Sequence, residues 1–178
     1  MATAEEILSA FKHYYARHPN LDFPDGGNKA LPLDEELAIL DVIDPNSITA
    51  GDVKKISSEL DQQEAYSLVI LAVRTAILAV RRSRPELLST AVVLLTIDDL
   101  VDYRDMLGAL SAIEWCCSRL SEDIGVLIQK FADLACERRK QIFFEAYLSR
   151  SAKERQPDVM GFQVEEKEGS IRFISHWA

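Results

Sequence analysis

Four aspartates form the densest group of residues in this sequence that could do chemistry. Asp98, Asp99, Asp102 and Asp105 fall within eight positions. Clustered carboxylate oxygens are the ligands that hard cations such as Mg²⁺ take, and residues three or four apart share one helical face. The same stretch lies between two predicted helices, where aspartates cap free amides and favour a helix N-terminus. We expect capping and solvation to explain the cluster, with a magnesium site at Asp98, Asp99 and Asp102 as the alternative.

Five of these positions also carry a family motif. The segment Asp98-Asp99-Leu-Val-Asp102 resembles the DDxxD motif of isoprenoid synthases, which are also all-helical. That resemblance implies a magnesium ion that carries a substrate diphosphate. The sequence holds no second aspartate-rich motif and no paired basic patch for a diphosphate, and the chain falls well short of the length that family usually needs. The magnesium-dependent enzyme therefore remains the alternative hypothesis.

Other catalytic patterns are absent from the sequence. It contains no G-x-S-x-G, no glycine-rich phosphate loop and no H-E-x-x-H. His13 and His18 are five positions apart rather than four, so they do not share a helical face well. Cys116, Cys117 and Cys136 lie in helical patterns, and we expect them to be reduced packing residues. We expect no catalytic residues and no cofactor, and favour a binding protein over an enzyme.

Composition and charge narrow the class of partner. The chain has 178 residues, enough for one domain with a sizeable core, and a formal net charge of −9. An acidic surface disfavours nucleic acid and anionic membranes and attracts a basic protein. The first residues show no basic n-region or early apolar block, and the runs 68–73 and 91–97 are too short to span a bilayer. We therefore expect a cytoplasmic protein.

The elements that position these residues are mostly helices. Helix starts are predicted at Thr3, which forms a capping box with Glu6, at Asp34 and at Thr49. The first helix should end before Pro19 and the second at Pro45, with a proline- and glycine-containing loop between them. Residues 1–60 are thus expected to hold the N-terminal helices and loop of a single domain that spans 1–178.

The segment 61–150 should form the core. Residues 65–82 are apolar on nearly every side, which is typical of a central helix. Pro85 suits the first turn of the next helix, and a fourth helix is expected from Ser121 through Ile142. The two helix pairs overlay with an offset of roughly 37 residues, within the range of HEAT and armadillo units. The sequence predicts a mainly α fold of stacked antiparallel helical hairpins, as a HEAT-like bundle or short superhelix.

The C-terminal residues change from helical to alternating spacing. Residues 158–175 predict a β-hairpin with Phe162, Val164, Ile171 and Phe173 on one face. A lone hairpin is barely stable in water, so we expect this face to lie as a lid on the helices. The alternative is an edge strand, or Trp177, held ready for a partner.

Two short elements resemble those of small, uncharacterised bacterial all-helical proteins. They are Asp-Tyr-Arg-Asp, here Asp102 to Asp105, and Gly161-Phe162 at the start of the hairpin; the resemblance covers roughly residues 85–173. No activity carries over from it. Small acidic proteins of this kind recur as immunity proteins or antitoxins, so the resemblance implies that role by analogy.

Three hypotheses follow. The first is a non-catalytic protein-interaction module, in its specific form an immunity or antitoxin protein that neutralises a basic partner. The second is the magnesium-dependent enzyme acting on a diphosphate, and the third is a structural subunit of a homo-oligomer. The residues expected to contact a partner are the acidic links between helices and one aromatic residue of the tail: Asp98, Asp99, Asp102, Asp105, Glu122, Asp123 and Trp177.

Overall fold

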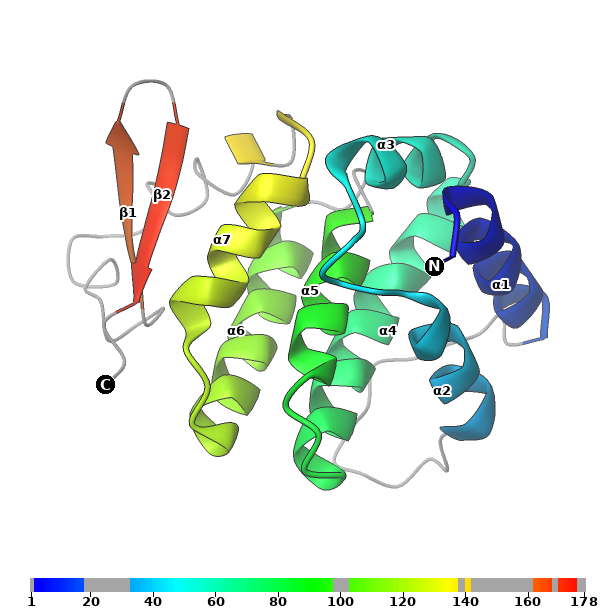
Figure 1. The fold of residues 1–178 in the computed structure, drawn as a ribbon, viewed down its shortest axis with the longest axis horizontal. Coiled ribbons are helices and arrows are strands. Elements are labelled where there is room, and N and C mark those ends of the chain that lie inside the picture. The colour runs from blue at the N-terminus through cyan, green and yellow to red at the C-terminus, as the bar shows by residue number, and fades with distance from the viewer. Residues whose placement is uncertain are drawn as a thin grey trace.

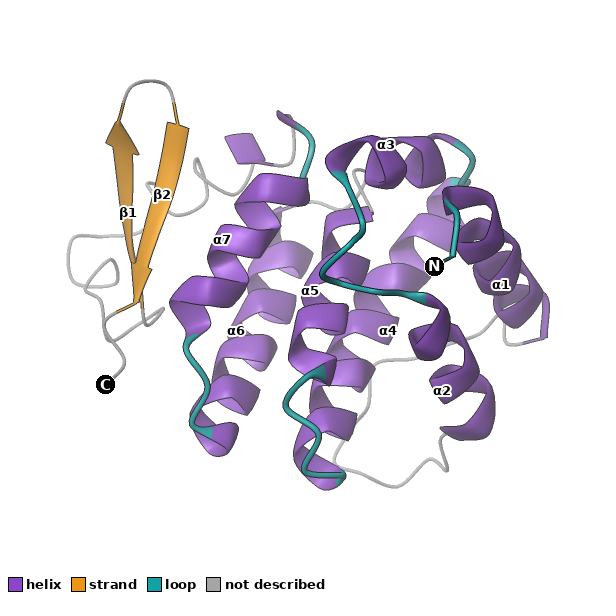
Figure 2. Cartoon of the chain, viewed as in Figure 1, coloured by secondary structure: helices purple, strands orange, loops and turns teal. Residues whose placement is uncertain are grey.

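The protein is mainly α-helical, as the sequence predicts (Figures 1 and 2). The computed structural model describes residues 2–17, 33–97, 103–137, 140–141, 162–167 and 170–175. These residues form seven named helices and two strands. The helices are α1 (Ala4–Arg17), α2 (Leu33–Val42), α3 (Ala50–Ser58), α4 (Gln62–Arg81), α5 (Leu87–Ile97), α6 (Tyr103–Leu120) and α7 (Ile124–Leu134).

The predicted caps of α1 and α3 are confirmed. The Glu6 amide donates to Thr3 Oγ1 at 3.2 Å while Glu6 Oε2 accepts from the Thr3 amide at 2.6 Å. Thr49 and Asp52 form the same reciprocal pair at the start of α3. The prediction that Asp34 caps the second helix is wrong, because α2 begins at Leu33 and Asp34 already lies in its first turn. An acidic residue is favourable both at the cap and in the first turn of a helix, since both positions lie at the positive end of the helix dipole.

Helix α4 is the central helix of the core, as expected from its apolar composition. It begins after Asp61, whose carboxylate caps it in a capping box with Glu64. Fourteen of its 20 residues are buried, and it packs against α5 and α6. Among the described residues it is the one helix long and apolar enough to cross a membrane, although 78% of its apolar window is buried inside the protein. Its hydrophobicity is therefore accounted for by its place in the core.

Helix α5 lies in the middle of the core and is covered by other helices. Ten of its 11 residues are buried, and it contacts α3, α4, α6 and α7. Figure 1 shows α5 between α4 and α7, with α6 behind. Phe131 of α7 and Leu94 of α5 are among the largest fully buried side chains. A helix that is apolar on all sides needs neighbours on all sides, and this packing supplies them.

The links α4–α5 and α6–α7 have the same backbone construction. Each contains a serine in the left-handed region, Ser83 with φ 51° and Ser121 with φ 56°. In each, the amide of the next residue, Arg84 or Glu122, donates at 2.9 Å to a carbonyl five residues back. This is the pattern of a helix C-terminus closed by a residue at positive φ. Because the helices alternate in direction, both links lie at the same end of the molecule (Figure 1).

The predicted fourth helix is shorter than expected. It should have continued through Ile142, but α7 ends at Leu134, and Ala135 adopts an extended conformation with φ −67° and ψ 145°. Helical hydrogen bonding resumes with the Lys140 amide, which donates to the Cys136 carbonyl at 3.0 Å. No proline or glycine marks this break, so helical periodicity alone did not reveal it. Ile142 lies outside the described residues.

Two strands follow near the C-terminus. They are β1 (Phe162–Lys167) and β2 (Ser170–Ser175), antiparallel, with Val164 opposite Phe173. Strand β2 lies beside α7 (Figure 1). The residues between the strands lie outside the described part, and for the strands the structure describes the backbone alone.

Candidate functional site

Few of the residues nominated from the sequence can be placed. Asp105 lies in the first turn of α6, and Glu122 and Asp123 form the exposed link between α6 and α7. The others lie outside the part of the chain that the structure describes: Asp98, Asp99, Asp102 and Trp177.

The placed acidic residues do not form one surface. Asp105 lies near the start of α6 and Asp123 follows its end, and the 15 helical steps from Asp105 to Leu120 span about 22 Å. Asp123 also has a structural role, because its carboxylate caps α7 by accepting from the Gly125 amide at 2.9 Å. Asp105 and the Glu122–Asp123 link would therefore meet a partner at two separate places.

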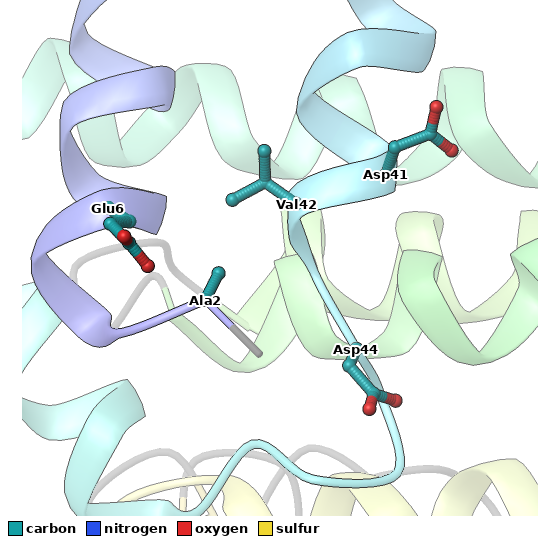
Figure 3. A pocket seen from close by; sticks show the side chains of 5 residues that line it. All are labelled: Ala2, Glu6, Asp41, Val42 and Asp44. Atoms are coloured by element: carbon teal, nitrogen blue, oxygen red, sulfur yellow. The ribbon is translucent and has the colours of Figure 1, made fainter.

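A different set of carboxylates lines an open cleft that the sequence did not indicate (Figure 3). It lies between the start of α1 and the end of α2, and its volume is about 550 Å³. Glu6 and Ala2 form one wall and Val42 faces them; Asp41 and Asp44 also line the cleft, with the carboxylate of Asp41 pointing away from Glu6. All three carboxylates are exposed. Three carboxylates thus line a cleft with a small apolar floor; none of the lining residues that the structure describes is basic, while Lys130 and the amino terminus of the chain act on Asp44 from nearby.

Local hydrogen bonds hold the second wall in shape. The Asp44 carboxylate accepts from the Asn46 amide at 3.0 Å. The Ser47 hydroxyl, and then this amide, lower the pKa of Asp44, so its charge is kept at acidic pH. Lys130 of α7 donates to the Pro45 carbonyl at 2.7 Å. The loop after α2 is therefore fixed by a hydrogen bond within its own turn and by a second hydrogen bond from α7.

Ion pairs hold the first wall. Lys55 of α3 pairs with Glu5 on the first turn of α1, and Lys12 of α1 pairs with Glu64 of α4 at 3.4 Å. Beneath them α1 buries Phe11 among the core residues. Exposed ion pairs add little stability, so apolar burial carries most of the attachment and the pairs orient the helix. Glu6, on the same turn as Glu5, is thereby held at the cleft.

Two exposed apolar side chains are further candidates for contact with a partner. Trp115 of α6 is 56% exposed and Val126 of α7 is 62% exposed. The guanidinium carbon of Arg119 lies 5.3 Å from the centre of the Trp115 ring. The sequence could have indicated Trp115, because it falls outside the apolar stripe of α6 that includes Ile113 and Cys117.

The buried thiols are poor nucleophiles. Burial raises the pKa of Cys116 to about 11, and burial together with neighbouring acidic groups raises that of Cys117 to about 12. Both thiols therefore stay neutral near pH 7. Among the residues that the structure describes, no three histidines, cysteines or carboxylates are grouped so that they could hold a metal ion.

Comparison of the chain with protein-family models, with curated proteins and with solved structures finds no match. The fold and the cleft define the class: a mainly α-helical protein with an acidic cleft between its first two helices.

Proposed function

We propose that this protein is a non-catalytic interaction module whose partner is a protein with a basic surface. The observation that carries the proposal is the cleft, which Glu6, Asp41 and Asp44 line together with Ala2 and Val42. The formal net charge of −9 acts in the same direction. A field of this sign concentrates cationic partners near the surface and speeds their encounter.

The chemistry of the cleft fits a lysine or arginine side chain. Carboxylates accept charge-assisted hydrogen bonds from an ammonium or guanidinium group, and these are stronger than neutral hydrogen bonds. The half-buried side chains of Ala2 and Val42 offer apolar contact for the aliphatic stem of such a residue. Because both walls are held by the core, the partner does not have to order them on binding, which lowers the cost of association.

The specific role we propose is an immunity or antitoxin function, in which binding neutralises a basic toxin in the cytoplasm. Stacked helical hairpins of the HEAT type would serve it, since such stacks present their links along an edge. Two features support that arrangement: the α4–α5 and α6–α7 links share one backbone construction, and α7 begins at Ile124, 37 residues after α5 begins at Leu87. The β2 strand beside α7 supports a lid on this stack.

The test begins with affinity capture from the source cells, followed by association kinetics with the purified partner. The variant E6Q/D41N/D44N removes the three charges, while the amides at positions 6 and 44 keep an oxygen that can accept the cap and turn hydrogen bonds. The control E59Q/D133N/E137Q removes three exposed charges elsewhere. We expect the cleft variant to slow association on the order of tenfold at low salt.

The control should slow association less than the cleft variant, and added salt should abolish the difference between them. A third variant, D98N/D99N/E122Q, tests the links nominated from the sequence. If the association rate is indifferent to salt and to all three variants, charge does not select the partner. The hairpin with Trp177, or the exposed Trp115, would then be the surface to pursue.

A further inference from the structure

One end of the molecule carries groups of opposite charge on neighbouring links. Arg81 and Arg82, at the end of α4, have exposed side chains. The following Arg84 is bonded to Glu86 at 2.8 Å, so these two largely cancel. The α6–α7 link at the same end carries exposed Glu122 and Asp123.

The two links are held side by side in a fixed orientation. Helices α4 and α6 pack together and run in the same direction, so the ends from which the links depart are neighbours (Figure 1). Packed helix axes lie about 8–10 Å apart. Each link is closed by a serine at positive φ and a 2.9 Å backbone hydrogen bond, which fixes its path. The backbone positions that carry the basic and the acidic groups are therefore fixed relative to one another.

We propose that this end of the molecule binds a second copy of the chain. A two-fold axis between two such ends brings Arg81 and Arg82 of each copy onto Glu122 and Asp123 of the other. Symmetric dimers bury the same patch on both subunits, and a patch with both signs is complementary to itself under this rotation. This inference does not depend on the basic partner, since it uses none of the residues of the cleft.

The charges alone would not hold a dimer, because exposed ion pairs are weak. The exposed apolar residues Trp115 and Val126 supply additional area. Trp115 lies five residues before the end of α6 and Val126 two residues into α7, so both are within about 8 Å of the link along the helix axes. An exposed tryptophan beside charged groups is a typical anchor of a protein contact.

The overall charge explains why this end would be used. With a formal net charge of −9, two copies repel one another as a whole. Self-association then requires a surface where each copy offers cations to the other's carboxylates. The α4–α5 and α6–α7 links meet that requirement on adjacent elements.

Charge reversal tests the pairing directly. The variant R81E/R82E makes the end of α4 acidic, so that both links are then acidic. The variant E122K/D123N removes the negative charges of the α6–α7 link and adds a positive one, while Asn at position 123 keeps the cap on α7. Sedimentation equilibrium of each variant alone should give a dimer Kd raised by more than about tenfold over the unsubstituted chain. An equimolar mixture of the two should form the heterodimer, because both contacts are again complementary.

The control E59K/D133N changes the net charge as E122K/D123N does, at exposed positions away from this end, and should leave the dimer Kd unchanged. Circular dichroism checks that each variant is folded, and R81Q/R82Q replaces R81E/R82E if that variant fails. The proposal is overturned if the unsubstituted chain stays monomeric up to about 1 mM. It is equally overturned if the variants dimerise like the unsubstituted chain. The same holds if the equimolar mixture of R81E/R82E and E122K/D123N forms no heterodimer.

Discussion

Lys130 and Pro45 join two elements that are 85 positions apart in the sequence: the Lys130 ammonium donates to the Pro45 backbone carbonyl at 2.7 Å. The bond ties α7 to the loop between α2 and α3, which passes in front of α5 in Figure 1. Asp44, the neighbour of Pro45, lines the acidic cleft. The shape of the cleft thus depends on a residue from the far side of the core.

Replacing Lys130 with methionine should lower the free energy of unfolding by about 1–2 kcal/mol. A hydrogen bond from a charged donor is worth about 1.5–3 kcal/mol, and this one is only partly buried. Urea denaturation measures the change. K54M, at an exposed lysine, is the matched control and should stay within about 0.5 kcal/mol. Equal midpoints for the two variants would show that the bond does not hold the loop.

The cap of the central helix gives a second prediction. Asp61→Ala removes the acceptor for the Glu64 amide, which lies 2.8 Å from the Asp61 carboxylate, and should cost about 1 kcal/mol. Asp61→Asn keeps a side-chain oxygen at the cap and should cost only a fraction of that. Thermal unfolding followed by circular dichroism distinguishes them. A loss as large for asparagine as for alanine would mean that charge, rather than capping, matters at this position.

The cysteines should differ in reactivity. Cys116 and Cys117 are buried with raised pKa values, whereas Cys136 is half-buried. Titration with a thiol reagent at pH 8 should modify Cys136 first, and all three only in denaturant. Rapid modification of all three in the folded protein would contradict the burial of the adjacent pair.

The same thiols predict a pH dependence. Their pKa values rise from an ordinary 9.0 to about 11 and about 12, so the unfolded chain ionises them first. Their contribution to stability is full below pH 9 and is lost as the pH rises through 11 and 12. C116A/C117A should therefore flatten the alkaline limb of a plot of unfolding free energy against pH.

The aspartate-rich stretch gives a prediction that separates binding from enzyme chemistry. If Asp99 and Asp102 cap helices, each replacement by alanine should destabilise by about 0.5–2 kcal/mol. Magnesium should leave the melting temperature unchanged, because no bound ion would favour the folded state. A magnesium-dependent rise that disappears in D99A/D102A would promote the diphosphate enzyme instead.

The C-terminal hairpin is tested by truncation after Gln156. If the hairpin covers the helices as a lid, its removal exposes apolar surface and lowers the melting temperature. Dye binding to exposed apolar surface should increase in parallel. An unchanged melting temperature would mean that the hairpin does not pack on the core, and would leave it free for a partner.

The sequence by itself determined the features that depend on neighbours along the chain. The helical class followed from periodicity, and the starts of α1 and α3 followed from Thr3 and Thr49, because a cap joins residues only three apart. The central place of α4 followed from its composition, since an apolar surface on all sides has to be covered.

Contacts between distant residues were decided only by the tertiary structure. The end of α7 at Leu134 follows no local signal. The cleft joins Glu6 to Asp41 and Asp44, and nothing along the chain indicates that these two segments meet. The direction of each helix sets Arg82 and Glu122 at one end of the molecule and Asp105 at the other. Such placements depend on how the helices pack, because packing brings together residues that share no local pattern.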